Sequence, residues 1–350
     1  MRAIGMGMLC AGLLQAGSIS VIDLGGFGGT TASGYAINSA GVVTGWAQTA
    51  AGATNGFVLH GSGLTDLNGA ADESFGYGVN SSGAVVGTRY ENGQAHATLW
   101  SGGSAVELSL GFATGINDSG EVVGGNGQAF VVSGGVLRSL GTLPGGKWSS
   151  AYGVNDSGDV VGYGDVAGGS FRGFVYLPQT GTVLLGTLGG NNSYAMAIND
   201  AGEIVGHAML ANGNEHAFEA TAGGPLVDLG TLGGSSSYAY GINNLGAVVG
   251  YSFTGANAAQ HAFLYYNGKM MDLNSIIPAN SGWVLNQAYG INDAGDIVGS
   301  GTYNGQTRAF LIDPVPLAAP EPMTCGLIGV GLIALALLGR RSRRRRGELD

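Results

Sequence analysis

One short phrase occurs seven times along this chain: an aliphatic residue, Asn, two further residues, Gly, one residue and then, in most copies, two aliphatic residues and Gly. Successive Asn residues are 42, 37, 38, 44, 44 and 49 positions apart, which is the period of solenoids and propellers. A repeated residue is first of all a packing residue, so the pattern constrains the fold more than the chemistry. We number the repeats 1 to 7 by these residues: Asn38, Asn80, Asn117, Asn155, Asn199, Asn243 and Asn292.

The composition agrees with a globular repeat protein. Gly accounts for 69 of 350 residues, while 45% of the chain is hydrophobic and only 10% is charged. This is too apolar for a disordered chain, and Gly has no three-residue period, so a collagen-like chain is excluded. We therefore expect many short strands joined by turns.

Each repeat contains four strand candidates. The first alternates small and large residues, as in Ala239–Asn243, and the second contains Val-Val-Gly, as in Val122–Gly124. An Asn-Asp-x-Gly turn joins them, which is typical of a hairpin. The third strand contains Ala-Phe or a variant, and the fourth ends in Asp-Leu or a similar pair.

Four strands in about 42 residues form one blade of an antiparallel propeller. The sequence therefore predicts an all-β, seven-bladed β-propeller of four-stranded antiparallel blades over residues 18–313. The chain opens with a fourth-type strand, Ser20–Leu24, and its last repeat ends with a third-type strand, Arg308–Ile312. We expect the N-terminal strand to complete the seventh blade, which would remove an exposed sheet edge.

The third and fourth strands also carry a family resemblance. The phrases His216-Ala217-Phe218, His261-Ala262-Phe263 and Asp228–Gly234 resemble the HAF family of extracellular repeats, over nearly all of residues 20–312. The resemblance implies an exported bacterial protein, and it carries over no catalytic residues because the family has no assigned activity. His96-Ala97-Thr98 and Arg172-Gly173-Phe174 depart from the phrase, which indicates that the His is dispensable to the repeat.

The N-terminus is typical of a secretory signal. Arg2 precedes the apolar stretch Ala3–Leu14, and Leu14-Gln15-Ala16 is similar to a cleavage site, so we expect a signal peptide over residues 1–16. A buried first strand is the alternative interpretation.

The C-terminus predicts a sorting signal. Pro320-Glu321-Pro322 ends a Pro-rich linker over residues 314–322, and a 17-residue apolar run over residues 323–339 predicts a transmembrane helix. Residues 340–350 form an Arg-rich tail that should stay cytoplasmic. The order of these parts resembles the PEP-CTERM signal of Gram-negative bacteria. That resemblance implies processing by an exosortase-type membrane protease and transfer from the inner membrane to the cell surface or medium. Plain tail anchoring is the alternative.

The cysteines and the charged residues are distributed unevenly between the two terminal segments and the region between them, which we call the body (residues 18–319). Cys10 and Cys325 both lie in the terminal apolar segments, so the body has no disulfide. Residues 18–319 carry six Lys and Arg against twenty Asp and Glu, a net charge of −14. An acidic body is a poor nucleic-acid binder and suits an exported protein or one that takes up cations.

Two kinds of residue could bind metal. His96, His216 and His261 share one position in three repeats, and equivalent positions around a ring do not converge, so we expect them to tie strands to turns. Four Asn-x-x-Gly turns carry paired carboxylates that make weak calcium candidates, although the full calcium-loop pattern is missing. Turn chemistry and solubility are the alternative for these residues. The pairs are Asp118 and Glu121, Asp156 and Asp159, Asp200 and Glu203, and Asp293 and Asp296.

The connections on the opposite face are the expected ligand-binding surface, because variable loops on a rigid scaffold usually carry binding. Exposed aromatic residues there would stack on sugars or contact another protein, and wedging between blades is the alternative, favoured for Trp148. The candidates are Trp283, Trp148, Phe75 and Tyr303.

No catalytic constellation stands out in the sequence. We therefore predict a non-catalytic binding or scaffold protein of the cell surface or extracellular matrix, with exopolysaccharide or surface proteins as candidate partners and no cofactor. A hydrolase or lyase acting on polysaccharide is the alternative. A pair of carboxylates pointing to the axis would favour the enzyme, and an axis of Ala, Gly and Tyr would favour the binder.

Overall fold

The computed structural model describes residues 19–69 and 71–313. The chain divides into two compact units, Met1–Val315 and Pro316–Asp350, and all described residues belong to the first. The predicted signal peptide, linker, transmembrane helix, Arg-rich tail and Pro320-Glu321-Pro322 motif lie outside the described residues. Within the described ranges, no helix has the length and apolarity needed to cross a membrane.

The described residues form an all-β structure, as the sequence predicts, with two 3-10 turns, η1 (Gly255–Asn257) and η2 (Leu273–Ser275). The strands are β1 (Val21–Asp23), β2 (Gly28–Ile37), β3 (Val43–Thr49), β4 (Thr54–His60), β5 (Gly63–Asp66), β6 (Glu73–Val79), β7 (Val85–Glu91), β8 (Gln94–Ser101), β9 (Ser104–Leu110), β10 (Phe112–Ile116), β11 (Val122–Gly125), β12 (Ala129–Ser133), β13 (Val136–Gly141), β14 (Ser149–Val154), β15 (Val160–Asp165), β16 (Phe171–Leu177), β17 (Gly181–Leu184), β18 (Gly189–Ile198), β19 (Ile204–Leu210), β20 (Glu215–Ala220), β21 (Val227–Asp228), β22 (Gly233–Ile242), β23 (Val248–Thr254), β24 (Gln260–Tyr266), β25 (Lys269–Asp272), β26 (Trp283–Ile291), β27 (Ile297–Tyr303) and β28 (Gln306–Ile312).

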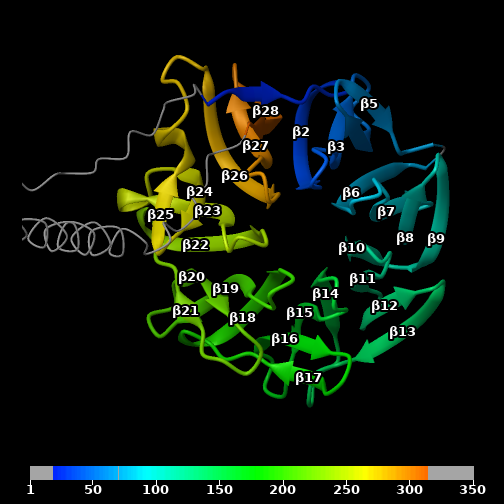
Figure 1. Cartoon of the computed structure of the whole chain (residues 1–350), viewed down its shortest axis with the longest axis vertical. Helices are drawn as coiled ribbons and strands as arrows, with labels where there is room; N and C mark the ends of the chain where they lie inside the picture. The colour runs from blue at the N-terminus through cyan, green and yellow to red at the C-terminus, as the bar shows by residue number, and fades with distance from the viewer. Residues whose placement is uncertain (1–18, 70, 314–350) are drawn as a thin grey trace, which may run out of the picture. The chain divides into compact units, whose positions relative to one another are not determined.

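Each repeat folds into strands that pair in chain order. Five four-stranded sheets run β6 to β9, β10 to β13, β14 to β17, β18 to β21 and β22 to β25. The strands β2 to β5 and β26 to β28 join in one larger sheet through a single parallel bridge, Thr31↔Thr307. Figure 1 shows the sheets arranged around a common axis, with the first strand of each repeat innermost.

The N-terminal strand β1 pairs antiparallel with β28, the third strand of repeat 7, in the register Val21↔Ile312 to Asp23↔Phe310. An ion pair supports this pairing, because a guanidinium nitrogen of Arg308 lies 3.1 Å from a carboxylate oxygen of Asp23. The first described strand therefore occupies the fourth-strand position of the last repeat.

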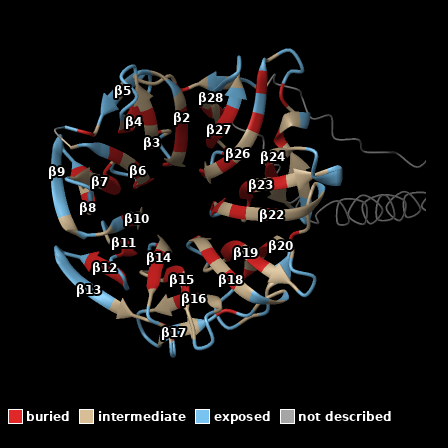
Figure 2. Cartoon of the chain, turned by 180° about the vertical axis from the view of Figure 1, so that it is seen from behind, coloured by how far each residue is buried: buried red, intermediate tan, exposed pale blue. Residues whose placement is uncertain are grey.

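The repeat phrase explains the core between sheets. In six repeats the Phe of the third strand is almost completely buried, and the second strands lie in the buried layer shown in Figure 2. The Gly after each aliphatic pair is needed for close packing: a Cβ added at Gly206 would lie 1.9 Å from the carbonyl oxygen of Tyr194. A larger residue there would force the first and second strands apart.

The Asn of each repeat has a role that the sequence analysis did not identify. The positive φ of each Asn turn falls on its Gly, as at Gly41 (76°), so the Asn is not needed for a left-handed conformation. The Asn side chain is buried and bridges neighbouring repeats. Its Oδ1 accepts the backbone N–H four residues on, as Asn292 does from Asp296 at 2.9 Å. Its Nδ2 donates to the backbone carbonyl of the Asn in the next repeat, at 2.8 to 3.2 Å in all seven.

Candidate binding site on the axis

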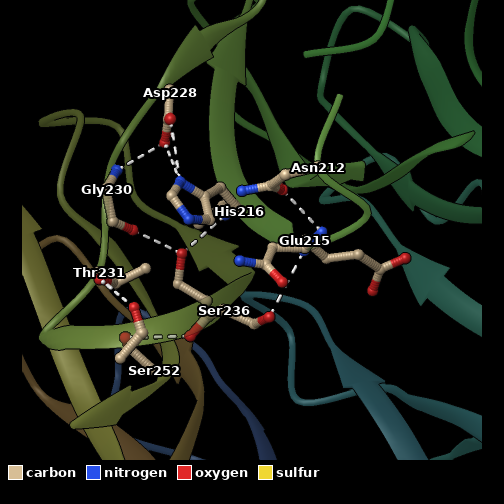
Figure 3. A network of polar contacts seen from close by, with 12 residues as sticks. Asn212, Glu215, His216, Asp228, Gly230, Thr231, Ser236 and Ser252 are labelled. Carbon is tan, nitrogen blue, oxygen red and sulfur yellow. Dashed lines mark hydrogen bonds and ion pairs between the residues drawn. The ribbon is translucent and has the colours of Figure 1, made fainter. Parts of the chain in front are cut away.

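The histidines of the third strands connect the third strand to the fourth strand of the same repeat, a contact that we call a strand tie. His216 Nδ1 lies 2.9 Å from the carboxylate of Asp228 on the neighbouring fourth strand, and that carboxylate also accepts the N–H of Gly230 at 2.8 Å (Figure 3). The same tie recurs with other residue types, which explains why the His is replaceable. The remaining pairs are Asn55 with Asp66, His96 with Glu107, Gln128 with Ser139, His261 with Asp272 and Arg308 with Asp23.

The paired carboxylates of the Asn turns point to different partners. Asp156 accepts the backbone N–H of Asp118 in the preceding repeat at 2.9 Å, whereas Asp159 accepts weakly from the side chain of Asn155 in its own turn at 3.4 Å. Asp118, Asp200 and Asp293 accept from preceding repeats in the first way, and Glu121, Glu203 and Asp296 accept from their own Asn in the second. Among the described residues, no three His, Cys, Asp or Glu side chains gather in a group that could hold a metal ion.

The aromatic candidates lie in or beside strands rather than in loops. Trp283 opens β26, is only 8% exposed, stacks on Tyr303 at 4.7 Å between ring centroids and meets the edge of Phe310 at 6.2 Å. The expectation that Trp283 is an exposed anchor is therefore wrong, because its ring fills the space between β26, β27 and β28. Phe75 is half-buried in β6 against Trp46.

The large residue of each first strand faces the axis. Three positions before each turn Asn, the seven repeats place Tyr35, Tyr77, Thr114, Tyr152, Met196, Tyr240 and Tyr289. Four of the tyrosines contact one another in sequence around the axis, with ring centroids 5.3 Å apart for Tyr240 and Tyr289, 4.8 Å for Tyr289 and Tyr35, and 5.4 Å for Tyr35 and Tyr77. The sequence analysis named an axis of Ala, Gly and Tyr as a feature that would favour a binder, but it did not assign these residues to a site.

Next to these tyrosines the structure contains a cavity of about 590 Å³. Its size falls in the range of small-molecule sites, which is about 300–1,000 Å³. Aromatic and aliphatic side chains make most of its wall, and Thr114, Ser150, Asn126 and the phenols supply polar atoms; no Asp, Glu, Lys, Arg or His lines it. The lining residues are Tyr35, Tyr77, Leu110, Gly111, Phe112, Thr114, Gly125, Asn126, Gly127, Trp148, Ser150, Tyr152, Met196, Tyr240 and Tyr289.

The tyrosines of the cavity are neutral groups. Burial raises the pKa of Tyr77, Tyr152, Tyr240 and Tyr289 well above the ordinary value of 10.0. The four phenols therefore stay protonated at neutral pH, where each can donate or accept a hydrogen bond without carrying charge. Trp148, the one candidate from the sequence that lines the cavity, is half-buried and contacts Tyr163 at 5.4 Å between ring centroids.

The same axial residues separate this cavity from a smaller chamber. That chamber holds about 260 Å³ and is lined by the axial residues together with the two residues that follow each of them, up to the aliphatic residue before each Asn. The Asn turns surround a further opening of about 270 Å³. The axial residues line both the cavity and the chamber, so they form the boundary between the two.

Comparisons with known proteins place the fold but not the activity. A family model described as "Protein of unknown function (DUF3466)" matches residues 191–313, and no curated protein matches the chain. The β-propeller domain of the trilobed protease from Pyrococcus furiosus is similar, at 10% identity over 81% of this chain and 93% of that chain, with a TM-score of 0.55.

Two other solved structures are more distant. TolB from Acinetobacter baumannii gives a TM-score of 0.43 at 12% identity over 83% of this chain, which spans only 65% of the TolB chain. A gluconolactonase from Xanthomonas campestris gives 0.42 at 11% identity over 85% of this chain and 90% of that chain. At such identities the likeness shows a fold alone, and the match to the Pyrococcus domain shows that fold to be of the β-propeller type.

Proposed function

We propose that this protein is an exported, seven-bladed β-propeller, closed by its N-terminal strand, that binds a ligand in the axial cavity without transforming it. Seven Asn turns linked one to the next by hydrogen bonds support the blade number. The pairing of β1 with β28 and the ion pair of Asp23 with Arg308 support closure. The pairing covers the edge of β28, which would otherwise invite association with other chains.

The observation that carries the binding proposal is the chemistry of the cavity wall. Acid–base catalysis on a glycosidic bond uses two carboxyl groups facing the substrate, and none of the cavity-lining residues has one. Burial raises the pKa of Tyr77, Tyr152, Tyr240 and Tyr289, so these phenols act as uncharged hydrogen-bonding groups. Trp148 adds a face for stacking. A wall of aromatic faces and uncharged hydroxyl groups suits recognition of an uncharged ligand with polar edges.

Export and sorting rest on the two ends of the chain. The apolar segment after Arg2 and the order of Pro320-Glu321-Pro322, apolar run and Arg-rich tail support a route through the inner membrane to the cell surface or medium. An exosortase-type protease is the proposed partner there. Replacing Pro320, Glu321 and Pro322 by Ala should block processing and leave insertion intact. Mass spectrometry that finds the same mature C-terminus in variant and parent would remove this part of the proposal.

The candidate ligand is the exopolysaccharide of the producing cell. Mature protein should be retained on that polysaccharide, and Trp148→Ala should weaken retention by about 1–3 kcal/mol, as loss of an aromatic anchor does. Tyr176→Ala is the matched control, because that aromatic side chain contacts Arg138 outside the cavity. The molar mass of the eluted polysaccharide should be unchanged. A shortened polysaccharide would show the protein to be an enzyme, and absence of retention would refute exopolysaccharide as the ligand.

A further inference from the structure

The wall of the axial cavity is lower at repeat 3, because the hairpin formed by the second and third strands of this repeat is short. We call this part of the wall the gap. The two strands, β11 and β12, have 4 and 5 residues, whereas β7 and β8 of repeat 2 have 7 and 8. The matching pairs Gly124↔Phe130 and Gly87↔Thr98 show that the hairpins start in the same register and that repeat 3 simply ends earlier. Residues 125–127 line the cavity, so the tip of this hairpin lies at its edge.

Repeat 3 also lacks the side chains that fill this region in other repeats. Thr114 replaces the axial Tyr found in five repeats, and Gly125 occupies the position of Tyr163 in repeat 4. Close neighbours favour glycine at both positions: a Cβ at Gly125 would lie 2.4 Å from the side-chain Oγ of Ser150, and one at Gly111 would lie 2.3 Å from the carbonyl oxygen of Gly125. The gap is therefore built into the packing of repeats 3 and 4.

Apolar side chains border this gap. Leu110 is 55% exposed and Phe112 is 43% exposed, and both line the cavity. Large apolar side chains at this exposure usually mark a contact surface when they lie together beside a pocket. The axial tyrosines of repeats 6, 7, 1 and 2, which are Tyr240, Tyr289, Tyr35 and Tyr77, contact one another in an unbroken series. The cavity wall is thus low at repeat 3 and is continuous and aromatic along these four repeats.

We infer that the cavity holds the terminal residue of a neutral glycan chain, and that the rest of the chain leaves through the gap in repeat 3 over Leu110 and Phe112. This inference rests on the proposed function and names its ligand more closely. A chain end fits because the axial tyrosines bound the cavity on its far side. A neutral glycan fits because the wall offers ring faces and hydroxyls but no cation to pair with an acidic sugar. An acyl chain would bring no polar group to the Asn126 side chain that lines this wall.

The first test uses the unaltered mature protein and size-graded fractions of the host exopolysaccharide. If chain ends are bound, calorimetry should give a stoichiometry that follows the number of chains and does not change with their length. Carboxyl-bearing polygalacturonate fragments should not compete, whereas a neutral fraction should. A stoichiometry that rises in proportion to chain length, competition by polygalacturonate alone, or displacement by laurate would each overturn the inference.

The second test closes the gap. Residues 126–128 would be replaced by the longer hairpin of repeat 2, residues 89–96, which starts from the same register, and Gly125 would be kept because a Cβ there would clash with Ser150. Affinity for an octasaccharide fraction should fall at least about tenfold, the effect of losing roughly 1.4 kcal/mol of binding, while affinity for a disaccharide fraction changes less than about threefold. Equal affinity of the variant and the parent for the octasaccharide would contradict the inference. Melting temperature serves as the folding control.

The two tests separate failure of this inference from failure of the proposed function. Binding that is sensitive to Trp148→Ala but has length-dependent stoichiometry would keep the axial site and remove chain-end recognition. Binding that is insensitive to Trp148→Ala would remove both.

Discussion

The side chain of Asn292 donates a hydrogen bond from Nδ2 to the backbone carbonyl of Asn38 at 3.1 Å, although 254 residues separate them. This bond links the last repeat to the first by the same contact that links every other neighbouring pair. Asn292 also accepts the N–H of Asp296 through Oδ1. One buried amide therefore holds its own turn and the turn of the next repeat.

Replacing Asn292 by Ala should destabilise the protein by about 1–3 kcal/mol for each buried polar group left without a partner. The N–H of Asp296 is the group at risk, because the carbonyl of Asn38 still accepts the N–H of Gly41 at 3.1 Å. Urea denaturation measures the effect, and Asn212→Ala is the control, because Asn212 is exposed and holds only its own turn. Equal stability of the two variants would show that the linked Asn turns are not a source of stability.

Deleting residues 19–24 should destabilise the whole repeat unit. The deletion removes β1, exposes the edge of β28 and leaves Arg308 without Asp23. Thermal unfolding and size-exclusion chromatography test this, since an exposed edge favours association as well as unfolding. A truncated protein that melts at the parent temperature and stays monomeric would show that the N-terminal strand does not close the fold.

Trp283→Ala should act on folding and not on ligand binding. The ring is buried against Tyr303 and Phe310, so its loss should cost about 3–5 kcal/mol of unfolding free energy, as large core truncations do. The neighbouring Val284 is 43% exposed, so Val284→Ala is a suitable control. Loss of glycan retention with unchanged stability would instead make Trp283 a binding residue.

Stability should fall between pH 6.5 and about pH 4 because of His207. Burial lowers the pKa of His207 from its ordinary value of 6.5 to about 4, and its ring is stacked on Tyr194 at 4.6 Å. Glu215 approaches the ring only to 4.0 Å, so burial outweighs its attraction. Below pH 6.5, His207 takes up a proton in the unfolded chain but stays neutral in the folded chain. Lowering the pH therefore favours the unfolded state.

The stability lost over this interval should total about 3 kcal/mol, since each pKa unit is worth about 1.4 kcal/mol. His207→Phe keeps the stacking and removes the titration, so it should flatten the pH dependence of unfolding in this range. His261→Gln, which changes a strand tie with Asp272, is the control. An unchanged pH profile in His207→Phe would contradict the assignment.

The repeat phrase predicted the strands well because it records packing that every repeat shares. The alternation in the first strands, the buried Phe of the third strands and the Gly of the turns all have local causes visible in the sequence. The partner of each Asn amide was not visible, because that partner lies one repeat away. Burial of Trp283 was missed for a similar reason: the residue opens a strand whose neighbours, Tyr303 and Phe310, come later in the chain.

The candidate site was harder to predict because it arises from a departure in one repeat. Thr114 and Gly125 look like ordinary substitutions in the sequence, and only the arrangement of the repeats around the axis shows that both line the cavity. Alignment of the repeats by their Asn residues would have exposed the shortened hairpin at residues 125–128. That alignment would not have shown that Trp148 lines the same cavity as this hairpin.

The most direct measurement of the central claim is the affinity of Thr114→Tyr for the host exopolysaccharide. The substitution gives repeat 3 the axial residue of five other repeats, so it should narrow the cavity at the proposed ligand position. The substitution also removes the hydrogen bonds that the Thr114 hydroxyl donates to the carbonyls of Val123 and Ala151. Calorimetry should show at least about a tenfold loss of affinity, corresponding to about 1.4 kcal/mol, in a variant that still unfolds cooperatively. Unchanged affinity in that folded variant would show that the ligand does not bind on the axis.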